Sequence, residues 1–224
     1  MRPGKHRSHR MTSTSSKTTR NRQILRSAIG LFTVVLLAGP ALADDAAEAQ
    51  AVVRQTVDQV LAVLATEGLS DDQRRQQIEE IAYQRFDFAT ISRLVIARKW
   101  KRFSPEQREE FVEQFKIQLS KNYGSRITRY EQEQVEILDH RLERNGDVTV
   151  RTRIDGGAAD GIEVDYRLRR KGRNKDGPWM VIDVIVEGVS LVSSYRAQFA
   201  EVLGHEDPSE LLKQLREKNA ASPE

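Results

Sequence analysis

The chain has 224 residues, with 36 Lys and Arg against 33 Asp and Glu, and it contains no cysteine. Eight basic residues and no acid lie within residues 1–43, so residues 44–224 keep 36 − 8 = 28 basic against 33 acidic side chains, a net charge of −5. Nucleic-acid-binding domains carry surplus cations, so this balance excludes that class and argues against simple adsorption to anionic lipid. Without disulfides, the fold must be held by its buried core.

Residues 1–43 have the zones of a secretory signal peptide in the usual order. A basic stretch is followed by the apolar run AIGLFTVVLLA and then by Pro40-Ala41-Leu42-Ala43, which predicts cleavage after Ala43. The apolar run has 11 residues, well short of the roughly 20 that span a bilayer. We therefore expect an exported protein in which residues 44–224 form a single domain with a substantial core.

Four helices are expected before the first strand. Residues 46–66 carry apolar side chains three and four positions apart, a second helix begins at the capping box Ser70-Asp71-Asp72-Gln73, and Asp87 caps a short third helix that ends near Trp100. Ser104-Pro105-Glu106-Gln107 begins a fourth helix over 105–130. That helix carries an aromatic-rich stripe: Phe111, Phe115, Leu119, Tyr123, Ile127 and Tyr130.

From about residue 135 the apolar positions alternate, which predicts four strands, at about 135–143, 148–154, 162–169 and 179–186. The turn-forming DGGAADG segment places Val150 opposite Tyr166, and it also sets Arg151 against Asp165 and Arg153 against Glu163. One face of the sheet is then apolar and the other charged. A glycine-bulge turn over Glu143–Gly146 would bring Leu138 and Leu142 to the apolar face, but Val135 and Ile137 then fit badly.

Ser190 lies where the last strand turns into a helix of about residues 190–203, which Gly204 is expected to end. A nucleophilic serine needs a G-x-S-x-G elbow and a histidine base, whereas the second glycine is missing here and residues 44–224 hold only His140 and His205. We expect Ser190 to cap the helix; a triad of Ser190, a histidine and Asp183 is the catalytic alternative.

Other chemistry has weaker signals. Two separate histidines without cysteine give no metal-ligand cluster of the usual spacing, and there is no glycine-rich phosphate loop. Arg196 is expected to reach Asp183 or Glu187, as a structural ion pair in preference to a contact with a lipid phosphate. Asp207-Pro208 is expected to cap a last helix.

Three helices, at 88–100, 105–130 and 190–203, carry broad apolar faces that must cover one apolar face of a small sheet. An ordinary packed core explains these faces, and a cavity for an apolar ligand would use the same residue types. The pattern alone leaves both interpretations open.

Three segments carry a family resemblance: FDFATISRLVIARKW, SPEQREEFVEQFKIQLSKNYGSRI and WMVIDVIVEGVSLVSSYRAQFAEVL. They resemble the MlaC family of periplasmic phospholipid-binding proteins, also called toluene-tolerance auxiliary proteins, and the resemblance covers about Ala46 to Lys218. It implies an α+β fold in which several helices cover the apolar face of a curved four-stranded sheet. This is an NTF2-like roll with an internal lipid cavity.

The resemblance also implies a function. Such a protein is a monomeric periplasmic carrier, not an enzyme, and has no cofactor apart from the bound phospholipid that is its cargo. It shuttles lipid between an outer-membrane lipoprotein–porin complex and an inner-membrane ABC transporter with an MCE-domain subunit, which maintains outer-membrane lipid asymmetry. A carrier of a hopanoid or another polycyclic lipid is the alternative within the family. A serine esterase or phospholipase is the alternative outside it.

The expected lipid-binding residues come from three helices and two strands: Phe88, Ile91, Leu94, Leu119, Tyr123, Ile127, Val150, Tyr166, Leu191, Val192, Tyr195 and Phe199. Phe111 lies nearest the Trp100 end of its helix and is expected to be solid core. Tyr123, Leu191 and Tyr195 are expected to line space, because a buried tyrosine hydroxyl needs a polar partner that a lipid ester could supply.

Overall fold

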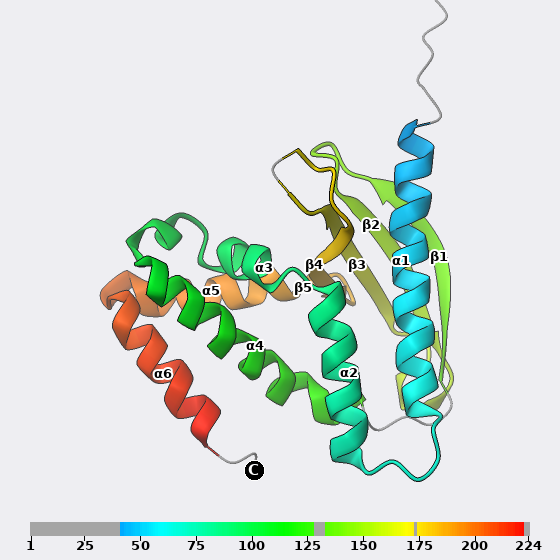
Figure 1. Cartoon of the computed structure of the whole chain (residues 1–224), viewed down its shortest axis with the longest axis horizontal. Helices are drawn as coiled ribbons and strands as arrows, with labels where there is room; N and C mark the ends of the chain where they lie inside the picture. The colour runs from blue at the N-terminus through cyan, green and yellow to red at the C-terminus, as the bar shows by residue number, and fades with distance from the viewer. Residues whose placement is uncertain (1–40, 128–132, 173, 222–224) are drawn as a thin grey trace, which may run out of the picture. The chain divides into compact units, whose positions relative to one another are not determined.

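The computed structural model describes residues 41–127, 133–172 and 174–221, without the side chains of 41–44 and 125–127. The described helices are α1 (Ala41–Leu64), α2 (Asp71–Arg85), α3 (Phe88–Ile96), α4 (Pro105–Ile127), α5 (Leu191–His205) and α6 (Pro208–Ala220). The described strands form one antiparallel sheet in the order of the chain: β1 (Gln134–Leu142), β2 (Val148–Asp155), β3 (Glu163–Arg170), β4 (Trp179–Val186) and β5 (Val189–Ser190). This confirms the predicted α+β class (Figure 1).

Parts of two expected segments lie outside the described residues: 1–40 of the expected leader and 128–130 of the expected fourth helix. The helix bounds otherwise shift by a few positions. The first helix begins at Ala41 and ends at Leu64, and α5 continues through Gly204 to His205.

The predicted helix starts are confirmed by their caps. The Gln73 N–H donates to Ser70 Oγ at 3.2 Å and the Ser70 N–H donates to Gln73 Oε1 at 2.9 Å, which completes a capping box. Ser104 and Gln107 form the same reciprocal pair at the start of α4. Asp87 and Asp207 accept backbone N–H groups at the starts of α3 and α6. Each cap satisfies donors that a helix end would otherwise leave unpaired.

The third helix is shorter than expected. Ala97 has a φ of 54°, in the left-handed region, so α-helical geometry stops at Ile96. The chain continues through Trp100 as a 3-10 helix, η1 (Ala97–Arg102).

The sheet has the predicted register between β2 and β3. Val150 lies opposite Tyr166, Arg151 opposite Asp165 and Arg153 opposite Glu163. The turn after β1 has Gly146 at φ 80°, with the Gly146 N–H donating to Glu143 O at 2.9 Å. This confirms the expected glycine turn.

A β-bulge at Leu138 corrects the expectation for β1. The register shifts between Ile137 and Asp139, so Leu138 is the extra residue and does not join the apolar face as a regular member. The shift sets Val135 and Ile137 on the same face as Leu142, opposite Ile154, Thr152 and Val148 respectively. The bulge therefore accounts for the two residues that regular alternation could not place.

A fifth strand also corrects the expected four. Glu187 and Gly188 have φ values of 50° and 76°, the pair of positive angles that a tight hairpin turn requires. The turn folds Val189 and Ser190 back onto Val186 and Ile185, which makes β5. Helix α5 therefore begins directly from the sheet edge.

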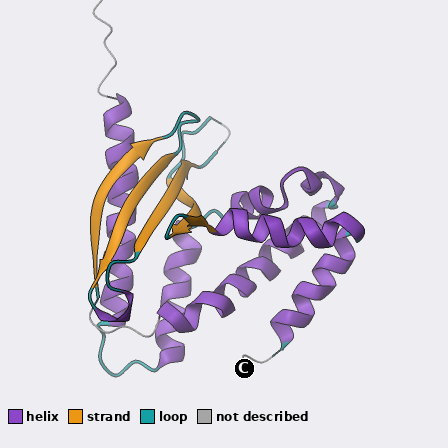
Figure 2. Cartoon of the chain, turned by 180° about the vertical axis from the view of Figure 1, so that it is seen from behind, coloured by secondary structure: helices purple, strands orange, loops and turns teal. Residues whose placement is uncertain are grey.

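The helices and the sheet form two packed groups. Helix α1 contacts β1, β2 and β4 along the apolar face of the sheet, and α2 contacts α1, α4 and β4. Helices α3, α4, α5 and α6 pack on one another, and α3 and α5 also contact β4. Figure 2 shows the opposite, charged face of β1–β3 in front of α1. Ion pairs on that face include Arg151 with Asp139 and Arg153 with Glu136.

Candidate functional site

The apolar face of the sheet has one half that is tightly packed. Val148, Val150, Leu168 and Val181 are buried against Ala46, Ala49 and Val53 of α1. Small side chains on the helix let its backbone approach the strands closely, so this half is solid protein interior.

The other half of the same face is covered less completely. Its apolar residues are only partly buried, although alternation and register set them on the face that α1 covers: Val135, Ile137, Ile154, Ile162, Val164, Tyr166 and Val184. We call this set the half-buried strip. Inward-facing apolar side chains that keep accessible surface are the residues expected to line an apolar ligand site.

The helical group has an aromatic centre. Phe111 and Phe115 of α4 are fully buried and stack at 5.5 Å between ring centroids. Phe199 of α5 contacts both edge-on at 5.6 Å, and Tyr195 contacts Phe115 at 4.9 Å. The expectation that Phe111 is solid core is confirmed.

Phe86 joins the helical cluster to the sheet cluster. It is partly buried and packs against both. A backbone bridge to Val181 and the hydrogen bond from the Asp87 N–H to Val181 O, at 3.0 Å, hold it beside β4. Its ring stacks on Phe88 at 5.9 Å. The α2–α3 connection is therefore the point where the two clusters meet, which the sequence pattern did not reveal.

The twelve predicted site residues divide among these surroundings. Ile91, Val192, Tyr195 and Phe199 are buried within the helical cluster, and Phe88, Leu94, Leu119 and Leu191 are partly buried at its margin. Val150 belongs to the packed half of the sheet face and Tyr166 to the half-buried strip. Tyr123 is 38% exposed, and the side chain of Ile127 lies outside the described residues.

Tyr195 and Tyr166 are the two predicted site tyrosines whose hydroxyl pKa values are raised, and Tyr195 has a hydrogen-bond partner. Asn122 Nδ2 donates to Tyr195 Oη at 2.7 Å, and Gln118 Nε2 donates to Asn122 Oδ1 at 2.9 Å, so the Tyr195 hydroxyl has a protein partner. Burial raises the pKa of Tyr195 to about 12, and burial likewise raises the pKa of Tyr166 to about 12. Both phenols therefore stay protonated at neutral pH. Sequence reasoning missed Asn122, although it interrupts an apolar face.

Ser190 is a helix cap, as predicted. Its Oγ accepts the Ser193 N–H at 3.0 Å and donates to Asp183 Oδ2 at 2.6 Å, while Asp183 Oδ1 accepts the Val192 N–H at 3.0 Å. The carboxylate contacts the serine directly, with no imidazole between them. His205 ends α5, 14 residues from its start, which at about 1.5 Å per residue is roughly 21 Å.

The expectation for Arg196 is wrong. Its Nε donates to Leu94 O at 3.0 Å, so this cation holds α5 against the end of α3. The nearest cation to Asp183 is Arg167, whose Nη1 lies 3.8 Å from Asp183 Oδ2. Arg167 is opposite Asp183 in the sheet register, whereas the turn before α5 directs Arg196 toward α3.

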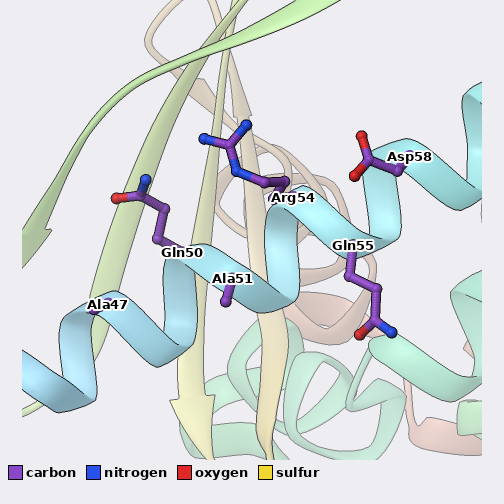
Figure 3. A pocket seen from close by; sticks show the side chains of 6 residues that line it. All are labelled: Ala47, Gln50, Ala51, Arg54, Gln55 and Asp58. Carbon is purple, nitrogen blue, oxygen red and sulfur yellow. The ribbon is translucent and has the colours of Figure 1, made fainter.

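Two surface hollows lie away from the predicted residues. One, of about 320 Å³, is lined by six residues of α1: Ala47, Gln50, Ala51, Arg54, Gln55 and Asp58 (Figure 3). The other, of about 310 Å³, lies where Leu142 and Glu143 approach Arg170 and Trp179. Charged residues help to line both hollows, for example Arg54 in the first and Arg170 in the second, and neither hollow includes a predicted lipid-binding residue.

Within the described residues, no group of three or more His, Cys, Asp or Glu side chains could hold a metal ion. His140 Nδ1 instead contacts Gln50 Oε1 of α1. None of the helices in the described ranges is long and apolar enough to cross a membrane.

Comparison with known proteins identifies the family. The model of the MlaC protein family matches residues 54–217, well over half of the chain. The chain belongs to the MlaC family. Two curated relatives agree with this MlaC assignment. The toluene tolerance protein ttg2D of Pseudomonas putida is 28% identical over 114 residues, which cover 50% of this chain and 51% of that protein.

The second relative is the intermembrane phospholipid transport system binding protein MlaC of Haemophilus influenzae. It is 26% identical over 130 residues, covering 58% of this chain and 60% of that protein. The chain therefore spans only half to three-fifths of these relatives. Among solved structures, the phospholipid-binding protein from Ralstonia solanacearum in complex with a phospholipid has a TM-score of 0.68 and 26% identity. The match covers 77% of this MlaC-family chain and 97% of that protein.

Proposed function

We propose that this protein is a periplasmic phospholipid carrier that shields the acyl tails of its cargo against the apolar face of its sheet. The observation that carries the proposal is the half-buried strip, which shares one sheet face with a fully packed half. Phe86 packs against that packed half and against the helical cluster. A relative of similar fold holds a phospholipid. The margin residues Phe88, Leu94, Leu119 and Leu191 would complete the site on the helical side.

The energetic case for a carrier follows from the cargo. Each methylene removed from water contributes about 0.8 kcal/mol, so a lipid with roughly 30 tail carbons resists transfer through water by about 24 kcal/mol. A protein that keeps the tails covered removes this barrier from the route, and docking on a partner then allows the tails to pass between apolar surfaces.

The protein would act in the periplasm, between two membrane complexes. The leader predicted at residues 1–43 would export the chain, leaving a single lipid-binding domain at 44–224. The MlaC membership and the name of the H. influenzae relative support a place in intermembrane phospholipid transport. The partners would be an outer-membrane lipoprotein–porin complex and an inner-membrane ABC transporter with an MCE-domain subunit. The monomer would thereby maintain outer-membrane lipid asymmetry.

The decisive experiment is lipid extraction from the protein purified from Asp44 without detergent. We expect about one two-tailed phospholipid per chain by organic extraction and mass spectrometry, because the apolar tails favour the covered site over water. Protein denatured before purification and refolded without lipid is the matched control. A lipid-free native protein would contradict the carrier function. A bound polycyclic lipid would instead identify the cargo as a hopanoid-type lipid.

A serine hydrolase is not supported by the geometry at Ser190. The Ser190 hydroxyl donates a hydrogen bond to Asp183 and caps α5, and neither described histidine contacts it. The carrier that we propose would need no catalytic residue and no cofactor other than its lipid cargo.

A further inference from the structure

Tyr166 places a hydroxyl on a sheet face whose other side chains are mostly apolar. It lies in β3 between Val150 of β2 and Val184 of β4, with Val164 and Leu168 as its same-face neighbours along the strand. On one side of it the sheet face is fully packed under α1, and on the other side the half-buried strip begins. Tyr166 therefore stands at the boundary between solid core and partly accessible surface.

The Tyr166 hydroxyl has no hydrogen-bond partner among the described residues, whereas the neighbouring hydroxyls on the same face and in the helical cluster do. Thr152 Oγ1 donates to Val164 O at 2.6 Å, and Tyr195 Oη accepts from Asn122. The Tyr166 hydroxyl is not one of the fully buried unpaired atoms of the described residues, so it keeps accessible surface and can donate to a ligand. The Tyr166 side chain is only partly buried, so a ligand that occupied the half-buried strip could reach it.

The chemistry of a phospholipid limits which of its atoms can pair with the Tyr166 hydroxyl. A phenol that stays protonated is a donor, so its partner must supply an acceptor oxygen. The ester carbonyls of a diacyl phospholipid are its polar atoms nearest to the tails. They are therefore the first acceptors that a donor among apolar side chains would meet.

We propose that Tyr166 is a specificity-determining residue, whose hydroxyl donates a hydrogen bond to an ester carbonyl oxygen of the bound phospholipid. This role rests on the proposed carrier function and deepens it. The residue would select ester-linked lipids over ether-linked lipids of the same shape, because only the ester offers a carbonyl acceptor.

The test is a competition with two probes that differ only at this linkage. Delipidated protein is loaded from mixed micelles containing equal amounts of a diacyl phosphatidylglycerol and the dialkyl ether analogue of equal chain length. The bound ratio is then measured by mass spectrometry. One neutral hydrogen bond predicts roughly three- to tenfold enrichment of the diacyl lipid in the native protein.

Tyr166→Phe keeps the ring and removes the donor, so the enrichment should fall to about one while total lipid per chain is maintained. The melting temperature of the empty variant should stay about the same, because the substitution removes no hydrogen bond within the protein. Tyr83→Phe, at a 38% exposed tyrosine of α2 that does not lie on the sheet face, is the matched control and should keep the native ratio.

The outcomes separate the proposal from the function on which it rests. An unchanged ratio in Tyr166→Phe, with lipid bound, would overturn the role of Tyr166 and leave the carrier intact. A native cargo without esters would overturn it as well. If neither probe binds to the native protein, the carrier function itself fails.

Discussion

At the scale of single residues, Asp183 and Ser190 together hold the start of α5. Asp183 is a buried carboxylate that accepts one hydrogen bond from the Val192 N–H and one from the Ser190 hydroxyl. Ser190 in turn accepts the Ser193 N–H. The two side chains thereby satisfy two of the free donors at the helix start and link α5 to β4, next to the two-residue strand β5.

Removal of the Ser190 hydroxyl should weaken the fold modestly. Ser190→Ala loses the N-cap, so we expect the free energy of unfolding to fall by about 1 kcal/mol, measured by urea denaturation. Lipid occupancy should be unchanged, because the hydroxyl points into the cap and not toward the half-buried strip. Ser190→Thr keeps a capping hydroxyl and is the control. A hydrolytic activity that disappears in Ser190→Ala and persists in Ser190→Thr would refute this assignment.

At the scale of elements, the second turn of α1 is tied to the sheet by Arg170. The Arg170 guanidinium pairs with Asp45 and Glu48 and lies over the Trp179 ring at 5.0 Å. These contacts fix the end of α1 that covers the packed half of the sheet. The later turns of α1 extend over the half-buried strip without a comparable ion pair to the strands among the described residues. The helix is therefore anchored at the end away from the proposed site.

The apolar faces of α4 and α5 should respond differently to substitution. Phe111→Ala opens a cavity among Trp100, Phe103, Phe115 and Phe199, so we expect a loss of about 3–5 kcal/mol in unfolding free energy. Leu191 is partly buried at the margin, so Leu191→Trp should cost less than about 1 kcal/mol and instead reduce lipid occupancy. Thermal melting and extracted lipid are compared for both variants.

One outcome would contradict the predicted difference between Phe111 and Leu191. If Leu191→Trp destabilises the empty protein as strongly as Phe111→Ala, the margin of the helical cluster is solid core. Tyr195 does not line open space as expected, because its ring packs on Phe115 and Phe199 and its hydroxyl accepts a hydrogen bond from Asn122. A charge placed there would disrupt packing whatever the location of the lipid.

The sequence predicted the features that depend on nearby residues. The capping boxes at Ser70 and Ser104 need only a side chain three positions away, and the β2–β3 register follows from one short connection. The phase of Val135 and Ile137 signalled an irregularity in β1, but it did not locate the bulge at Leu138. That position depends on pairing with β2 along the whole strand.

The site was less predictable because its residues depend on how elements cross. Periodicity identifies the inward face of a helix, but it does not distinguish Leu119 at the margin from Phe115 at the centre. The Asn122–Tyr195 hydrogen bond joins residues 73 positions apart, and the direction of Arg196 depends on the turn before α5. Such contacts follow from tertiary geometry, which a local pattern does not encode.

At the scale of the whole molecule, the net charge of residues 44–224 is −5, and no described helix can span a membrane. A carrier with this net charge is repelled by an anionic bilayer. Without a docked partner, the lipid tails must pass through water when they leave the protein. Spontaneous release therefore has to overcome a large barrier that transfer to a docked partner avoids.

Spontaneous release from the loaded protein should therefore be very slow. For a two-tailed lipid, a barrier of about 24 kcal/mol corresponds to a half-time on the order of a day at 25 °C. The measurement follows a fluorescent diacyl phospholipid from protein to neutral phosphatidylcholine vesicles without partner proteins. The rate should not change with vesicle concentration, because escape into water limits it. A single-tailed lysophospholipid has about half the methylenes and should leave within seconds, which verifies that the vesicles accept lipid. Transfer of the diacyl lipid within minutes, at a rate proportional to vesicle concentration, would mean that collision with a bare membrane opens the site.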